Sequence, residues 1–146
     1  MARLCAAILL FLVVAACGET GTANSASPKP SATFTMGQMN GSGVTGIGQV
    51  YKGAGTFTVS IQIHGMTPKS SHMSHVHIGS CAKPGNIAYA LLQVVADAQG
   101  NATATSIVAE YYTMPATGWY VNVHEGESMD EAEYLPSISC GDLPVA

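Results

Sequence analysis

The stretch GTFTVSIQIHG (residues 55–65) alternates apolar and polar side chains along its length. Because a strand places successive side chains on opposite faces, this period of two predicts a half-buried strand of an antiparallel sheet. One face then carries the apolar set toward a core, and the other carries the polar set. The apolar set is Phe57, Val59, Ile61 and Ile63, and the polar set is Thr58, Ser60, Gln62 and His64.

Similar short segments make up the rest of the chain, and glycine- and proline-bearing turns separate them. Further strands are predicted over residues 44–51, 74–79, 87–95, 101–109, 118–126 and 137–141. The run at 87–95 is compatible with a helix by propensity, but its neighbours and the turn that follows favour a strand. We therefore predict an all-β domain over 34–146, a seven- or eight-stranded antiparallel Greek-key barrel or sandwich.

The amino-terminal residues predict export. Arg3 precedes an unbroken apolar run from Leu4 to Ala16, and thirteen residues are too few for a helix that spans a bilayer. We expect residues 1–16 to be a signal peptide. The following "VAAC" resembles the bacterial lipobox, which implies that Cys17 is lipidated and becomes the first mature residue. Residues 17–33 would then tether the domain to the outside of a bacterial cell membrane. The alternative is an ordinary signal with an incidental Cys17.

Composition argues against some partners and sites. Without Arg3, four lysines face nine acidic residues, a formal net charge of −5, so neither nucleic acid nor an anionic lipid surface is an expected partner. The acidic cluster at 125–133 is expected to be a solvated loop. The chain has no phosphate-binding glycine loop followed by lysine and no GxSxG nucleophile motif.

Two cysteines remain for the domain once Cys5 and Cys17 are assigned to the signal and the anchor. These two, Cys81 and Cys140, are expected to form one disulfide in an exported protein. A bridge that closes about 60 residues stabilises the fold by roughly 4 kcal/mol. Export also argues against a metal site made of reduced thiolates.

The histidines predict a metal site. His75 and His77 are two residues apart on a predicted strand, so both side chains project from one face. His124 lies on the polar face of another predicted strand and completes a three-nitrogen site if the two strands are neighbours. Imidazole is a ligand for copper and zinc. Asn122 or Tyr120 is placed to orient a ligand ring, and the sequence does not decide between them. The alternative is a row of solvated histidines.

Four segments resemble the copper–zinc superoxide dismutases, in the same order along the chain. "HVHIGSC" (75–81) resembles the copper-binding strand of that family, and "VVADAQGNAT" (94–103) its "ADxxGxA" hairpin. "VNVHEG" (121–126) resembles the late "VVHE" strand, and "SISCGDL" (137–143) the terminal "ACGVI" strand. The resemblance implies a superoxide dismutase-like fold, His75, His77 and His124 as copper ligands, and a disulfide between Cys81 and Cys140.

Several features of the dismutases are absent. The long zinc loop has no counterpart between Cys81 and Ala96, so the resemblance does not imply a zinc site, and the usual fourth copper ligand is missing. The family's superoxide-guiding arginine falls on Ser137, and the domain contains no arginine. His72, in a serine-rich turn three residues before His75, is a candidate fourth ligand, whereas His64 is expected to be solvated. Superoxide or another small redox substrate is the implied partner, and slow or absent dismutation is expected.

A second resemblance leads to a different function. "HVHIGS" and "WYVNVHEG" also resemble the "HIHGP" and "LYVNVHT" motifs of chordin-type (CHRD) domains, which are β-sandwich modules. Three functions therefore follow from the sequence: a copper-dependent dismutase-like protein, a copper carrier or buffer without turnover, and a metal-free binding or surface module. Met36, Met39, Met66 and Met73 are expected to be core fillers, although thioethers are also ligands for reduced copper.

Overall fold

The computed structural model describes residues 27–130, 132 and 135–145, which contain ten strands. The predicted signal peptide and Cys17 lie outside the described residues. No helix among these residues has the length and hydrophobicity needed to cross a bilayer. The strands are β1 (Ala32–Gln38), β2 (Thr45–Lys52), β3 (Phe57–His64), β4 (Ser71–His72), β5 (Ser74–Ser80), β6 (Lys83–Ala90), β7 (Val94–Val95), β8 (Ala102–Val108), β9 (Trp119–His124) and β10 (Ser137–Asp142).

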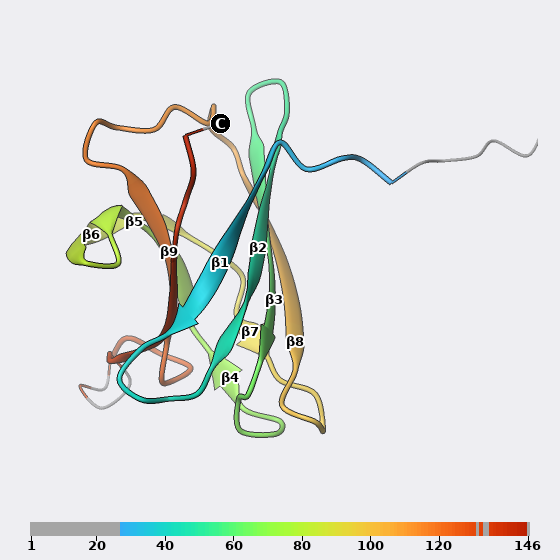
Figure 1. The fold of residues 1–146 in the computed structure, drawn as a ribbon, viewed down its shortest axis with the longest axis vertical. Coiled ribbons are helices and arrows are strands. Elements are labelled where there is room, and N and C mark those ends of the chain that lie inside the picture. The colour runs from blue at the N-terminus through green and yellow to red at the C-terminus, as the bar shows by residue number, and fades with distance from the viewer. Residues whose placement is uncertain (1–26, 131, 133–134, 146) are drawn as a thin grey trace, which may run out of the picture.

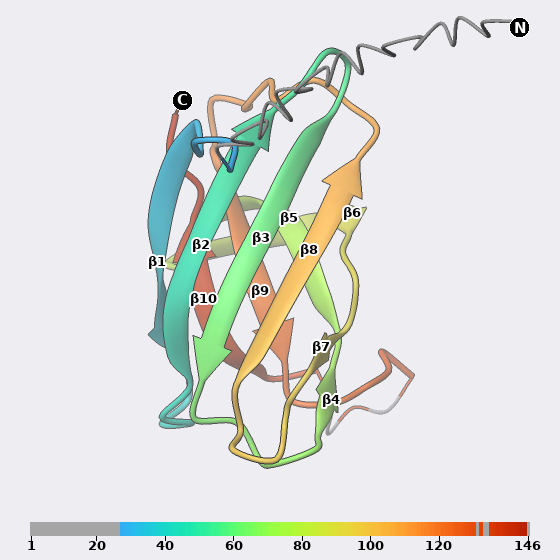
Figure 2. The same ribbon diagram turned by 90° about the vertical axis from the view of Figure 1, so that its right-hand side faces the viewer.

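Eight of these strands form one curled antiparallel sheet in the order β6-β5-β9-β10-β1-β2-β3-β8. The curl produces two layers, with β1, β2, β3 and β8 in one and β10, β9, β5 and β6 in the other (Figures 1 and 2). Strand β1 joins them, because it pairs with β2 along Ala32–Met36 and with β10 at Gly37 and Gln38. The sequence predicts a seven- or eight-stranded antiparallel barrel or sandwich, and the structure confirms this fold class as an eight-stranded sheet curled into a half-barrel.

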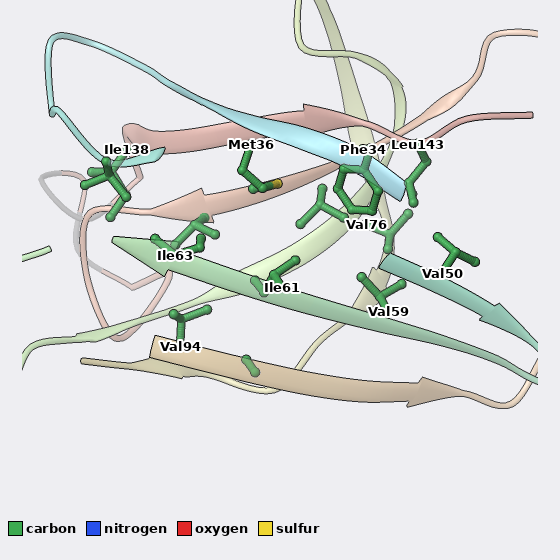
Figure 3. Close-up of a cluster of buried hydrophobic side chains, with 14 of the residues drawn as sticks. Phe34, Met36, Val50, Val59, Ile61, Ile63, Val76, Val94, Ile138 and Leu143 are labelled. Atoms are coloured by element: carbon green, nitrogen blue, oxygen red, sulfur yellow. The ribbon is translucent and has the colours of Figure 1, made fainter. Parts of the chain in front are cut away.

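The core lies between the two layers and follows the alternation of β3. Phe57, Val59, Ile61 and Ile63 are at most 1% exposed, and the polar residues between them face outward. Figure 3 shows Ile61 and Ile63 of β3 near Met36 of β1 and Val76 of β5, so both layers contribute side chains. Burial of each large apolar side chain stabilises the fold by about 1.5–3 kcal/mol.

The structure differs from the sequence prediction at several places. Strand β1 is not among the predicted strands, and it begins at Ala32, within the expected tether. Strand β4 covers Ser71–His72, in the expected serine-rich turn. The single strand predicted over 87–95 is wrong, because β6 ends at Ala90 and β7 covers only Val94–Val95. Between them the chain leaves the edge of β5 and crosses to β4 and β8. Leu92 is 61% exposed there, and its N–H donates to the Ser106 hydroxyl.

Candidate metal centre

Strands β5 and β9 are direct neighbours and carry the three predicted ligands on one face. In their antiparallel register His75 lies opposite Asn122, and His77 lies opposite Tyr120. Val76 and the valines of β9 point the other way into the core. The histidines therefore occupy the outer face of the second layer, on strands whose inner face is fixed by packing.

This outer face is covered, although the sequence alone makes it look like a solvated polar surface. All six residues of β9 are buried, and His75, His77 and His124 are only 3–8% exposed. Strand β6 and the loop after β9 reach over the rings, since the carbonyls of Gly85 and Leu135 contact them. The site is thus a largely enclosed cluster of imidazoles.

His75, His77 and His124 converge on one point. One nitrogen from each ring can be chosen so that all three lie within 4.8 Å of one another. The ring centroids are 5.3 to 5.9 Å apart. Two nitrogens that bind one ion at about 2.0–2.1 Å are separated by no more than about 4 Å. Small side-chain adjustments therefore suffice to place all three on one ion.

Backbone carbonyls set which nitrogen of two histidines is available. The Nδ1 atoms of His77 and His124 lie 2.9 Å and 2.7 Å from the carbonyl oxygens of Gly85 and Leu135. A carbonyl only accepts, so each Nδ1 carries the proton and each Nε2 keeps its lone pair. The Nε2 of His77 and the Nδ1 of His75 are buried without a hydrogen-bond partner among the described residues. These unpartnered nitrogens are what a metal ligand requires before binding.

Two of the three rings, those of His75 and His77, stay neutral at physiological pH. Burial, reinforced by the neighbouring His124 and His77, lowers the pKa of His75 from 6.5 to about 4. Burial also lowers the pKa of His77; the Gly85 hydrogen bond opposes this shift and the nearby His124 adds to it. Since a metal binds the neutral ring, no proton has to leave either group near pH 7. The donor set is three imidazoles, which suits copper or zinc.

Both residues that the sequence offers as orienting groups contact the ligands, in different ways. The Asn122 Nδ2 atom lies 3.1 Å from Nε2 of His124. The Tyr120 ring stacks on His77 with centroids 5.0 Å apart. Sequence reasoning misses the carbonyls of Gly85 and Leu135, because every residue has a carbonyl. Only the fold places these two next to Nδ1 of His77 and His124.

The structure does not bring His72 into the cluster. Its Nδ1 donates to the carbonyl of His124 at 2.9 Å, and its Nε2 lies 2.6 Å from the Ser70 hydroxyl. Both ring nitrogens are therefore occupied, and the side chain supports the backbone of a ligand residue. His64 is exposed and contacts Asn101 Oδ1 at 3.0 Å on the other layer, away from the cluster.

Cys81 and Cys140 form a disulfide with their Cα atoms 5.9 Å apart. Cys81 lies in the turn between β5 and β6, and Cys140 lies in β10 opposite Asn122. The N–H of Cys81 also donates to Asp142 Oδ1 at 2.7 Å. These links fasten the turn after the histidine strand to the strand beyond β9.

Comparison with known proteins identifies the fold. No known family's sequence profile matches this chain, and no curated protein matches it in sequence. Among solved structures, a SOD-like protein from Bacillus subtilis is similar with a TM-score of 0.59 at 15% identity, covering 77% of this chain and 97% of that one.

Two substituted forms of the same Bacillus subtilis protein are also similar. The one with a single proline-to-histidine replacement has a TM-score of 0.60 at 16% identity, covering 76% of this chain and 96% of its own. The double variant, in which a tyrosine and a proline are replaced by histidine, has a TM-score of 0.59 at 17% identity, covering 76% and 95%. The fold of the present chain is therefore superoxide dismutase-like.

Proposed function

We propose that this chain is an exported, membrane-anchored lipoprotein whose superoxide dismutase-like domain binds one copper ion through His75, His77 and His124. The observation that carries the proposal is the convergence of three buried imidazoles, two of which have an unpartnered ring nitrogen. A buried polar atom without a partner is costly unless a ligand completes it.

Copper is proposed over zinc because of the donor set. For a given set of nitrogen ligands, Cu²⁺ binds more tightly than the other divalent first-row metals. The cluster contains no carboxylate and no thiolate. Within the part of the chain that the structure describes, no second group of three His, Cys, Asp or Glu side chains is close enough to hold one metal ion. A one-electron couple is the chemistry that copper supplies when bound.

The surroundings of the site make it a poor dismutase. The segment after His124 is acidic and contains Glu125, Glu127 and Asp130. The domain contains no arginine. Superoxide is an anion, so this local charge and the net negative charge slow its approach. We propose that superoxide turnover is slow or absent and that a bound copper ion is held or exchanged with a small partner.

Metal analysis of the purified exported protein tests the proposal. After copper loading and dialysis, the parent is expected to retain one copper per chain and His75→Ala/His77→Ala to retain none. His64→Ala is the matched control, because it removes an exposed histidine outside the cluster and should bind as the parent does. Equal copper in the parent and the double variant would leave a metal-free binding module, as in the CHRD comparison. A superoxide assay on the loaded parent then measures turnover.

A further inference from the structure

Asn122 lies beside the candidate metal centre and contacts one of its histidines. It lies on β9 between His75 of β5 and Cys140 of β10, directly opposite each in the register. The side chain is 3% exposed and shares the outer face with the three histidines. It is the uncharged polar residue that contacts a predicted ligand nitrogen, at 3.1 Å from Nε2 of His124.

The amide of Asn122 is only half satisfied. Because Nδ1 of His124 donates to Leu135, its Nε2 accepts, and the Asn122 Nδ2–H group is the donor. The other amide atom, Oδ1, is buried without a partner among the described residues. Native structures seldom leave a buried carbonyl oxygen unpaired, so this orientation of the amide leaves an acceptor unused that the opposite orientation can turn toward the histidines.

A cation bound by the histidines removes the hydrogen bond between the Asn122 side-chain amide and His124. Once the Nε2 lone pair of His124 is used for binding, the Asn122 N–H loses its acceptor and its positive end faces the cation. Half a turn about Cβ–Cγ exchanges the amide oxygen and nitrogen, which have nearly the same size. The oxygen then faces the ion. Two ligands of one ion at about 2.0–2.2 Å are about 3 Å apart with the ion off the line between them, so the side chain also shifts sideways from its present position 3.1 Å from Nε2.

We propose that Asn122 is the fourth ligand of the metal centre, through its amide oxygen; this inference rests on the copper site proposed above. The chain lacks the usual fourth histidine of the dismutases, and Asn122 supplies a neutral oxygen instead. Carbonyl oxygen is a harder donor than imidazole or thioether, so it favours the oxidised over the reduced ion. Asn122 therefore biases the site toward Cu(II).

Two substitutions separate a ligand role from a merely structural one. Asn122→Leu keeps the approximate shape and removes both polar atoms, whereas Asn122→Asp keeps an oxygen donor and removes the N–H donor. Cu(II) and Cu(I) affinities are measured by chelator competition, and the ligand set is read from the electron paramagnetic resonance spectrum of the Cu(II) protein. Asn101→Leu is the matched control, because Asn101 contacts His64 outside the cluster.

We expect Asn122→Leu to lose roughly 10- to 100-fold in Cu(II) affinity, with a smaller loss for Cu(I) and an altered spectrum. Asn122→Asp should keep Cu(II) binding within about threefold of the parent or improve it, and Asn101→Leu should match the parent. If Asn122 serves only as a hydrogen-bond donor to His124, Asn122→Asp loses Cu(II) affinity as Asn122→Leu does. That result overturns the inference. The comparison of Asn122→Asp with the parent stands even if Asn122→Leu does not fold.

The remaining outcomes separate this inference from the proposed function. A parent that retains copper while Asn122→Leu shows the same affinity and spectrum overturns the fourth ligand and leaves the three-histidine site standing. A parent that retains no copper overturns both.

Discussion

At the scale of single residues, two of the candidate ligand rings are oriented by atoms on their far sides. The carbonyls of Gly85 and Leu135 hold Nδ1 of His77 and His124, so each Nε2 is turned into the cluster. Such second contacts fix the tautomer and commonly contribute 10- to 100-fold to metal affinity. Backbone carbonyls of other residues therefore decide which ring nitrogen of His77 and His124 is available to a metal.

A buried neutral histidine predicts an acid-sensitive metal-free protein. The pKa of His75 is about 4 when folded and 6.5 when exposed, so the unfolded chain binds more protons between these values. The contribution of His75 is fully present above pH 6.5 and is lost as the pH falls toward 4. Between pH 7 and pH 4.5 we expect the free energy of unfolding of the metal-free protein to fall by roughly 2 kcal/mol because of this group, measured by urea unfolding.

The control for this pH effect is His75→Gln, which removes the titrating ring and keeps a polar side chain. Its unfolding free energy should change less between pH 7 and pH 4.5 than that of the parent. Identical pH profiles for the two proteins would show that His75 does not supply the effect.

The sequence predicts the ligand residues better than the atoms that they use. The i, i+2 spacing places His75 and His77 on one face whatever the rest of the fold does. The meeting with His124 depends on β5 and β9 being neighbours, which comes from the family resemblance and not from local pattern. The proposed role of Asn122 Oδ1 depends on the hydrogen bonds around it and has no signature in the sequence.

At the scale of elements, β3 is predictable and β6 is not, for one physical reason. Strand β3 lies inside the sheet between β2 and β8, so one face is buried and the alternation is clean. Strand β6 is an edge with mostly exposed side chains, and it ends within an apolar run that has no turn residue. Its end is set by the crossing to the other layer, which is a tertiary feature.

The close contact of β6 with β5 predicts the effect of one methyl group. A Cβ at Gly85 would collide with the backbone carbonyl of Ile78. Gly85→Ala should therefore push β6 outward and move the Gly85 carbonyl away from His77. We expect copper affinity to fall by roughly tenfold or more, measured by chelator competition. Gly37→Ala is the control, since its Cβ meets only the Cys140 carbonyl at 3.8 Å. Equal losses of copper affinity in the two variants would contradict the explanation by displacement of the Gly85 carbonyl.

At the scale of the whole molecule, the disulfide restrains a large part of the chain. Cys81 and Cys140 are 59 residues apart, and a loop of that size corresponds to about 4 kcal/mol of stabilisation. Cys81→Ser/Cys140→Ser should lower the urea midpoint accordingly, and the parent in reductant should behave like the variant. Two readily labelled thiols in the folded, unreduced domain would rule out the bridge in solution.

The attachment of the domain to a membrane is tested at Cys17. We expect the parent to fractionate with membranes and Cys17→Ser to be released, because one lipid-modified residue ahead of a polar tether is the proposed anchor. A Cys17→Ser protein that stays in the membrane fraction would contradict the lipoprotein proposal. Cys5→Ser is the control, since Cys5 lies within the proposed signal.

The two faces of β5 and β9 can change independently over evolutionary time. Val76 and Val121 hold the architecture from one side, while the histidines and Asn122 face the other. Mutational drift on the outer face can erase an imidazole or install a different donor without opening a void among the valines. Lineages that share this fold are then better sorted by the residues at positions 75, 77, 122 and 124 than by their total sequence identity.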